Sequence, residues 1–384
     1  MRLAIVTTHP IQYYAPVFHL LHQRQQLTIK VFYTWGEGVT DKFDPGFNKK
    51  IAWDIPLLEG YPYEWVENTA KDPGTHHFGG IVNPGLIEQL DNWKLDALLI
   101  YGWGFRSHLK IIRHFKGKIP VFFRGDSNLL DLTGGLKAIF RSLFLKWVYR
   151  HVDHAIYVGT NNKAYYKKYG LKDDQLTFGP HAIDNKRFSA DVSDEALQLR
   201  SRLAIAPDEK VVLFAGKFED KKDPMILLEA FLNLNKSDVH LIFVGNGPLE
   251  EQLKTKSANI SNIHFIGFQN QLQMPVMYQA CDIFCLPSKG PGETWGLAIN
   301  EAMASGKAVL VSDKAGAAID LVKPGQNGAI FKANNLAGLL EKLDKLITVS
   351  KTELAVMGTI SKKLIGEWSF ENQVKAIEDA VNHD

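Results

Sequence analysis

Cysteine is almost absent from this 384-residue chain, which contains only Cys281 and Cys285. Two cysteines in one strand-like stretch provide no disulfide framework, and a metal site would need further ligands. We therefore interpret both as small apolar core residues. So little cysteine is typical of a reducing compartment, and we expect a cytoplasmic protein without structural disulfides.

Long apolar runs are also missing. No stretch approaches the roughly 18 to 20 apolar residues that a membrane-spanning helix needs. The N-terminal sequence MRLAIVTTHP predicts a buried strand and lacks the apolar region and small-residue cleavage site of a signal peptide. A G-x-G-x-x-G fingerprint does not follow that strand, which argues against a nicotinamide-dependent dehydrogenase. We expect neither a membrane-spanning helix nor a secretory leader.

A large net charge is absent as well, since the formal value is +2. The two halves differ, however: residues 1–190 contain 24 Lys and Arg against 17 Asp and Glu, and the remainder contains 20 against 25. A basic first half favours an anionic partner or membrane surface, unless it is only scattered solvated charge. No nucleic-acid-binding motif accompanies it, and we expect no nucleic acid partner.

Short apolar strands alternate with helical patterns along almost the whole chain. This alternation predicts parallel sheets with crossover helices, and two such halves predict two doubly wound α/β domains. A polar, proline-bearing stretch near residues 180–208 separates them. We predict a first domain over residues 1–185 and a second over 186–366. A helix over 367–384 then either caps its own domain or crosses back to the first.

Ligands of such sheets bind beyond the carboxyl ends of the strands, so the loops that follow strands are the candidate sites. The strand KVVLFA ends before Gly216, and Lys217 and Lys222 follow it. Two lysines there can neutralise a diphosphate, or they can form an ordinary solvated turn. After the next strand, Gly245 and Gly247 permit a tight turn and are explained by close packing alone.

The stretch GPGETWGLAINEAMASG is the most informative in the chain. We predict that a helix begins around Trp295 or Gly296, where free backbone amides, those of Gly296 and Leu297 among them, form an anion site. Glu301 lies about 7 to 8 Å farther along the helix axis, which suits the ribose of a nucleotide. Glu293 lies in the loop, where a sugar joined to the diphosphate would sit. Taken singly, each glutamate is also explained as a helix-end acid or a solvated helix residue.

Together these residues resemble glycosyltransferase family 4, the retaining enzymes of GT-B fold. The similar segments follow the family's order and spacing over most of residues 205–335: AGKFEDKKDP, VGNGPLEEQL, HFIGF, YQACDIFCLPS, GETWGLAINEAMASGKAVLVSD and LVKPGQNGAIF. The resemblance implies two Rossmann-like doubly wound domains that face a cleft. The N-terminal domain would bind the acceptor and the C-terminal domain the nucleotide sugar, with the last helix returning to the N-terminal domain.

The resemblance also implies roles for residues of the second half. Lys217 and Lys222 match the basic pair on the donor diphosphate, although the first is more often arginine. Glu293 matches the first glutamate of the paired-glutamate motif, which contacts the donor sugar, and we predict that it is catalytic. Glu301 matches the ribose ligand, and Phe268 lies where the backbone contacts the base. The remaining expected donor contacts are Gly216, Gly296 and Leu297.

The first half departs from the family pattern. The Gly-Gly loop that often follows the first strand is replaced by THPIQYYAP, which supplies His9 and Gln12. The usual histidine after the strand IPVFFRG is replaced by Arg124 and Asp126. We predict His9 and Asp126 as catalytic candidates and Gln12, Arg124 and His108 as substrate contacts, although a helix histidine such as His108 is more often a packing residue.

The function that the resemblance implies is a metal-independent, retaining hexosyltransferase of polysaccharide biosynthesis. It would move a sugar from a nucleotide-diphosphate sugar, with a UDP- or GDP-sugar favoured, to a hydroxyl of a glycan, a glycolipid or a small molecule. In this family the leaving phosphate takes the acceptor proton on the same face. We expect no cofactor and no metal. The alternatives are a non-hydrolysing sugar-nucleotide epimerase and a non-catalytic sugar-nucleotide-binding protein.

The segment 134–151 indicates where an acceptor membrane could bind. Its core LKAIFRSLFLKWVYRH contains large apolar residues and no acid, and its basic residues are Lys137, Arg141, Lys146 and Arg150. This pattern is typical of a membrane-surface helix, although an ordinary packed helix also fits. A peripheral position at the inner membrane face would suit a lipid-linked or polysaccharide acceptor. A soluble acceptor needs no such contact.

Overall fold

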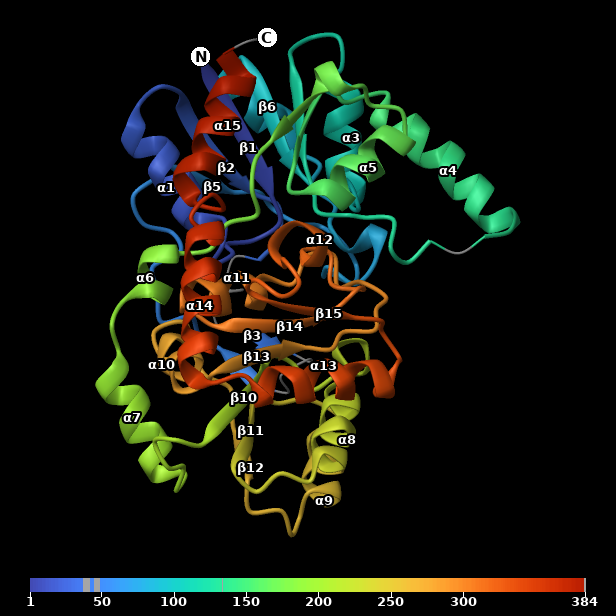
Figure 1. Cartoon of the computed structure of the whole chain (residues 1–384). Coiled ribbons are helices and arrows are strands. Elements are labelled where there is room, and N and C mark those ends of the chain that lie inside the picture. The colour runs from blue at the N-terminus through green and yellow to red at the C-terminus, as the bar shows by residue number, and fades with distance from the viewer. Residues whose placement is uncertain (37–41, 45–48, 133, 383–384) are drawn as a thin grey trace. The chain divides into compact units, whose positions relative to one another are not determined.

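The computed structural model describes residues 1–36, 42–44, 49–132 and 134–382. The chain forms two compact units, each built on a parallel β-sheet with helices around it (Figure 1). Unit 1 consists of residues 1–42, 55–181 and 370–384. Unit 2 consists of residues 43–54 and 182–369. The sequence did not indicate that a short segment of the first half, residues 43–54, would join unit 2.

Unit 1 contains a seven-stranded parallel sheet of order β5-β2-β1-β6-β7-β8-β9. Its strands are β1 (Arg2–Thr7), β2 (Thr28–Tyr33), β5 (Tyr63–Trp65), β6 (Ala97–Tyr101), β7 (Val121–Arg124), β8 (His154–Tyr157) and β9 (Leu176–Phe178). Its α-helices are α1 (Ala15–Arg24), α2 (Leu86–Trp93), α3 (Arg106–Phe115), α4 (Leu136–Tyr149), α5 (Thr160–Lys168) and α15 (Phe370–Asn382). The central strands β6 and β7 are buried along their whole length, as a sheet covered on both faces requires.

The C-terminal helix α15 belongs to unit 1, where it packs against α1 (Figure 1). An ion pair of 3.0 Å between Arg24 of α1 and Glu378 of α15 supplements the apolar contact. Val374, Ile377 and Val381 of α15 are fully buried. The last helix therefore returns to the N-terminal unit, as the predicted fold requires.

Unit 2 contains a six-stranded parallel sheet of order β12-β11-β10-β13-β14-β15. Its strands are β10 (Lys210–Ala215), β11 (Val239–Val244), β12 (Ile263–Ile266), β13 (Ile283–Leu286), β14 (Ala308–Ser312) and β15 (Gly328–Phe331). The short strands β3 (Lys42–Asp44) and β4 (Lys49–Ile51) form a separate two-stranded sheet. Its α-helices are α6 (Asn185–Ser189), α7 (Ser193–Arg202), α8 (Pro224–Leu234), α9 (Glu250–Lys256), α10 (Met274–Ala280), α11 (Leu297–Ala304), α12 (Ala318–Leu321), α13 (Leu336–Thr348) and α14 (Lys351–Ile365).

Strand order reverses at one point in each sheet, between β1 and β6 in unit 1 and between β10 and β13 in unit 2. Helices on the two sides of such a point depart in opposite directions, which leaves a crevice at the carboxyl ends of the two strands. The loops that the sequence marked as candidates follow β1, β10 and β13. The fold thus places them where an α/β sheet binds ligands.

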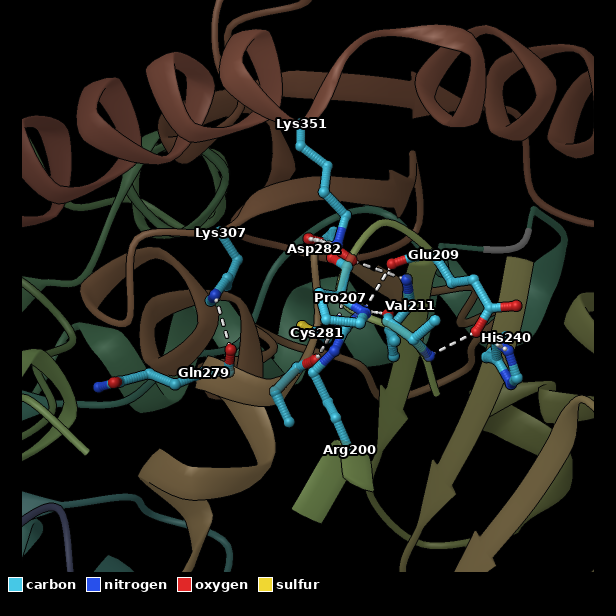
Figure 2. A network of polar contacts seen from close by, with 12 residues as sticks. Arg200, Pro207, Glu209, Val211, His240, Gln279, Cys281, Asp282, Lys307 and Lys351 are labelled. Atoms are coloured by element: carbon cyan, nitrogen blue, oxygen red, sulfur yellow. Dashed lines mark hydrogen bonds and ion pairs between the residues drawn. The ribbon is translucent and has the colours of Figure 1, made fainter. Parts of the chain in front are cut away.

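The opposite, amino-terminal edge of the second sheet is held by a polar network (Figure 2). Arg200 of α7 donates to the carbonyl oxygens of Ala206 at 3.0 Å and Ala280 at 3.1 Å, and it lies 3.4 Å from Asp282. The carboxylate of Asp282 accepts from the amide of Val211 at the start of β10, at 2.8 Å. Because these contacts join α7 to the starts of β10 and β13, they stabilise the sheet far from its ligand-binding edge.

Candidate functional site

Two loops meet at the switch point of unit 2. The loop after β10 begins at Gly216 and passes through a short 3-10 helix over Asp220–Lys222. The loop after β13 runs to the start of α11. The amide of Lys289 in the second loop donates to the carbonyl oxygen of Lys221 in the first at 2.9 Å, which ties the loops together. The lysines and the glutamate predicted from the sequence therefore lie on adjoining loops.

Lys222 and Glu293 form a partly buried ion pair at this junction. The Nζ of Lys222 lies 2.7 Å from Oε2 of Glu293, and the Ser288 hydroxyl donates to the same oxygen at 2.9 Å. Burial by itself raises the pKa of Glu293, which is 8% exposed, but the charge of Lys222 and these hydrogen bonds outweigh it and hold the pKa below its ordinary value. The carboxylate is ionised at neutral pH. The sequence indicated neither this ion pair nor the hydrogen bond from Ser288 to Glu293.

The backbone before α11 adopts a conformation that favours glycine. Gly296 has a φ of 100°, and a Cβ on it would lie 3.0 Å from the side chain of Leu286. Leu297 is the first helical residue, close to the predicted start. The amide of Gly316, from the loop after β14, donates to the Glu293 carbonyl at 3.2 Å and steadies the preceding loop. The first amides of α11 thus lie beside the Lys222–Glu293 pair, and their role as an anion site stays a prediction.

Glu301 is buried on α11 and is not the solvated helix residue of the alternative interpretation. The hydroxyl of Tyr278, on α10, donates to its Oε2 at 2.7 Å. This contact fixes the orientation of the carboxylate. Tyr278 was missed by sequence analysis because 23 residues separate it from Glu301 and only the packing of α10 beside α11 brings them together.

The two glycines after β11 pack against the loop after β10. A Cβ on Gly245 would lie 2.0 Å from the carbonyl oxygen of Gly216, and one on Gly247 would lie 2.6 Å from that of Phe218. Close backbone approach therefore explains both glycines, in agreement with the packing interpretation. Lys217 lies between the two contacted residues, so this packing positions it at the loop's start.

Phe268 follows β12 and lies next to the loop after β11. Its amide donates to Oδ1 of Asn246 at 2.8 Å, and Nδ2 of Asn246 donates to Glu250 at 2.9 Å. The amide of Phe268 is thus used within the protein. Contact with a base, which the resemblance implies for this position, would have to come from its carbonyl group or its ring.

In unit 1, His9 and Gln12 lie in the loop after β1, at the switch point of that sheet. The Nδ1 of His9 lies 2.9 Å from the Thr8 hydroxyl, and the imidazole packs edge-on against Trp35 with 5.3 Å between ring centroids. Both predicted residues are partly exposed. Their catalytic and binding roles stay predictions.

Arg124 and Asp126 differ sharply in their surroundings. Arg124 is 2% exposed and donates to the carbonyl oxygens of Gly179 at 2.8 Å and Pro180 at 2.9 Å. Its guanidinium therefore joins the end of β7 to the chain after β9, which favours a structural role over substrate contact. Asp126 is partly exposed in the loop after β7 and stays a candidate.

His108 is completely buried in α3. Its Nδ1–H donates to the carbonyl oxygen of Gly102 at 2.9 Å, and Nε2 accepts from the hydroxyl of Thr34 at 2.8 Å. Burial lowers its pKa to about 4, so the ring is neutral at physiological pH. This is the environment of a packing histidine, the less specific of the two interpretations that the sequence allowed.

Stability is expected to fall as the pH is lowered from about 6.5 to about 4. Burial also lowers the pKa of His181 to about 4, so both His108 and His181 bind a proton in the unfolded chain before they do in the native protein. Each contributes up to about 3 kcal/mol that is fully present above pH 6.5 and is lost in this window. Urea unfolding of His108→Gln should show a weaker pH dependence than the wild type. An undiminished dependence, equal to that of the exposed-site control His22→Gln, would contradict this.

Helix α4 carries apolar side chains on two faces. Leu145, Val148 and Tyr149 are buried against unit 1. The opposite face is an exposed apolar stripe, referred to below as the α4 stripe, of Leu136, Ile139, Phe140, Leu143 and Phe144. Leu136 is 75% and Phe140 70% exposed, although each would normally prefer burial. A groove of about 910 Å³ runs beside it, and its cationic lining residues are Lys137, Arg141, Lys146 and Lys168.

Neither unit contains a helix, among the residues that the structure describes, with both the length and the apolar character needed to cross a bilayer. The α4 stripe is therefore a surface feature of a short helix. The sequence shows its spacing of three and four residues. It does not show which of the two apolar faces of α4 is buried.

Three side chains of unit 1, Asp72, His76 and His77, form a cluster of the kind that can hold a metal ion. Nε2 of His76 and Nε2 of His77 lie 3.1 and 3.4 Å from one carboxylate oxygen of Asp72. All three belong to an exposed or half-exposed loop. Within the described ranges this is the sole group of three such ligands, and the residues around Lys222 and Glu293 supply none.

Comparison with known proteins finds a family model that matches part of the chain. Residues 196–363 match the family of group 1 glycosyl transferases. The matched range includes the loops after β10 and β13, the Lys222–Glu293 pair and α11.

Two curated relatives match parts of the chain. The alpha-monoglucosyldiacylglycerol synthase of Acholeplasma laidlawii is 30% identical over 211 residues, 52% of this chain and 50% of the relative. The phosphatidyl-myo-inositol mannosyltransferase of Mycobacterium leprae is 32% identical over 142 residues, 36% of this chain and 37% of the relative. The chain thus spans about half or less of the length of these relatives.

A solved structure extends the likeness to the whole chain. Anabaena HepE in complex with UDP superposes with a TM-score of 0.76 at 17% identity, and all of both chains is covered. The same protein has been solved with UDP-glucose. At this identity the likeness shows the fold, which is the two-domain, Rossmann-like GT-B fold that the sequence predicted.

Proposed function

We propose that the protein is a metal-independent, retaining glycosyltransferase that moves a hexose from a nucleotide-diphosphate sugar to a hydroxyl of a membrane lipid or lipid-linked glycan. The observation that carries the proposal is the partly buried Lys222–Glu293 ion pair beside the amino end of α11, at the switch point of unit 2. The family match over this range and the lipid-modifying names of the two relatives support it.

In the proposed complex the donor diphosphate lies between Lys217, Lys222 and the first amides of α11. Its negative charge draws Lys222 away from Glu293, because an oxyanion accepts a charge-assisted hydrogen bond as well as a carboxylate does. The carboxylate of Glu293 then accepts hydrogen bonds from hydroxyls of the sugar. Glu301, oriented by Tyr278, accepts from the ribose hydroxyls. The UDP and UDP-glucose complexes of HepE favour a uridine donor.

The proposed reaction breaks the bond between the sugar C1 and the β-phosphate oxygen and forms a bond from C1 to the acceptor oxygen on the same face. The acceptor proton passes to the leaving phosphate oxygen. Positioned cations and amides stabilise the charge that develops on this phosphate, which is the main contribution the protein makes. Lys222 and the α11 amides supply that stabilisation without a metal.

The proposal is tested by incubating the full chain with UDP-glucose and diacylglycerol vesicles in the presence of a chelator. We expect UDP and an α-linked glucolipid to appear together, with the anomeric configuration read by proton NMR. An epimerase would instead convert the sugar nucleotide without any acceptor. A non-catalytic protein would bind UDP-glucose and release nothing. A product of inverted configuration would contradict the retaining mechanism.

The lipid acceptor is proposed from the α4 stripe. Its apolar residues recur at three- and four-residue spacing, and α4 contains no acid. The flanking groove is lined by four cationic residues and one acid, Asp131. Such a helix lies in the interface of an anionic bilayer, with the apolar face among the acyl chains and the cations at the headgroups. We therefore propose a peripheral position at the inner membrane face.

The double variant Leu136→Ser/Phe140→Ser is expected to weaken binding to phosphatidylglycerol-containing vesicles by about 10²- to 10⁴-fold. Burial of each side chain contributes roughly 1.5 to 3 kcal/mol, and serine removes this contribution. Vesicle flotation measures the effect. The matched control is Val356→Ser, at an exposed apolar position of unit 2. Equal flotation of the double variant and the control would remove the membrane proposal and favour a soluble acceptor.

A further inference from the structure

One segment of the first half of the chain lies in unit 2. Residues 43–54 belong to that unit, although the chain on both sides of them belongs to unit 1. A short segment of this kind has no hydrophobic core of its own, so contacts with unit 2 must offset the conformational entropy that it loses when it is ordered. The described contacts gather at the end of the excursion, Ala52 to Asp54, which we call the arm.

The arm is held at two points beside β12. Nδ2 of Asn270 donates to the carbonyl oxygen of Ala52 at 2.6 Å, and the amide of Leu272 donates to Oδ2 of Asp54 at 3.1 Å. Between these anchors, the indole of Trp53 lies edge-on to the ring of Phe268, with 6.4 Å between centroids and an interplanar angle of 65°. Because the residues on both sides of Trp53 are hydrogen-bonded, the position of its backbone is fixed.

Neither ring of this pair is fully covered. Trp53 and Phe268 are both partly exposed, whereas a tryptophan that served only as a packing anchor would bury its large apolar surface. The two rings therefore present a partly open aromatic corner at the carboxyl end of β12. A flat group inserted there would gain contact with both.

The corner lies at a suitable place for a nucleobase. In the sheet order β12-β11-β10, two strand spacings of about 4.8 Å separate β12 from β10, or about 10 Å. Lys217 and Lys222 follow β10, so the corner lies about one nucleoside away from the proposed diphosphate position. Asn246, after the intervening strand β11, holds the amide of Phe268 and so fixes the corner to the rest of the site.

We propose that Trp53 is a base-binding residue, and that the nucleobase of the donor packs against the Trp53–Phe268 corner. The inference rests on the proposed function and adds to it a residue that lies outside the family match. The arm supplies the base contact, while the loops after β10 and β13 supply the contacts to diphosphate, ribose and sugar. Asn270 and Asp54 act as positioning residues, since they hold the arm.

The test is calorimetric titration of the full chain with UDP, GDP and inorganic pyrophosphate. Stacking of one base on an aromatic side chain contributes roughly 1 to 3 kcal/mol, which corresponds to about 5- to 150-fold in affinity. Trp53→Ala is expected to weaken binding of the preferred nucleotide within that range and to leave pyrophosphate binding unchanged. Trp53→Phe should restore most of the loss. Trp147→Ala, which removes a partly exposed tryptophan of α4, is the control and should match the wild type.

A second measurement does not depend on the stability of the alanine variant. The tryptophan fluorescence of the wild type should change when the nucleotide is added, and this change should be reduced in Trp53→Phe at saturating nucleotide. Unchanged nucleotide affinity in Trp53→Ala, or an undiminished fluorescence change in Trp53→Phe, would overturn this inference but not the proposed function. A wild type that binds pyrophosphate but no nucleotide, or neither, would overturn the proposed function and this inference with it.

Discussion

Replacing Lys222 by methionine is expected to lower kcat for sugar transfer by about 10²- to 10³-fold, the usual cost of removing one preorganised group that stabilises developing negative charge. Methionine keeps much of the length and apolar surface of lysine and removes its charge. The structure brings Nζ of Lys222 to the junction of the two donor loops, within 2.7 Å of Glu293. Steady-state kinetics with UDP-glucose and lipid acceptor measure the loss.

The control for this variant is Lys254→Met. Lys254 lies on α9 and is exposed; its Nζ lies 2.6 Å from Glu250 and 5.8 Å from the ring centroid of Phe265. An exposed pair of this type contributes little to stability, and we expect kcat to change less than about twofold. If Lys222→Met kept the rate of the control while it remained folded, the charge of Lys222 would have no part in the reaction.

Glu293→Gln is expected to lower kcat by a similar factor of about 10² to 10³. Glutamine has the shape of glutamate but places a donor where the ionised carboxylate accepts from Lys222 and Ser288. Because Lys222 and Glu293 act on one ligand, the double variant should lose much less than the product of the two single losses. A fully multiplicative loss would contradict a shared role.

The pH profile gives an independent check on Glu293. In the free protein its pKa lies below the ordinary glutamate value, so the carboxylate is ionised above pH 4.5 and kcat/KM should not decline on its account until the pH falls below that. By the same shift, Glu293 contributes stability that is present above its unfolded pKa and is lost as the pH falls through the folded one. Glu251→Gln, at an exposed position of α9, serves as the control for the glutamine substitution.

Much of the fold could be predicted from local patterns. Alternation of apolar strands and helices gave both parallel sheets, and the polar stretch near residue 180 marked the passage between them. The return of α15 to unit 1 required the family resemblance, since an amphipathic helix does not reveal which core it covers. The place of residues 43–54 in unit 2 depends on contacts with Asn270 and Leu272, more than two hundred residues away.

The site divides in the same way. Gly296 and the start of α11 could be predicted because a helix terminus is a local property of the chain. The Lys222–Glu293 ion pair and the Tyr278–Glu301 hydrogen bond could not, because each joins elements that are adjacent only after the sheet forms. For Arg124 and His108 the sequence suggested more than the structure supports. Their residue types are common in active sites, but both side chains are buried and hydrogen-bond to backbone carbonyl groups or to a neighbouring side chain.

The most direct test of the donor site is thermal stabilisation of the full chain by UDP-, GDP-, ADP- and dTDP-sugars. The proposed site predicts that one sugar nucleotide raises the Tm and that Lys222→Met and Glu301→Ala each abolish most of the rise. Lys254→Met should retain it in full. Stabilisation that persists undiminished in both site variants, or a wild type that responds to no sugar nucleotide with acceptor lipid present, would contradict the assignment of the donor site.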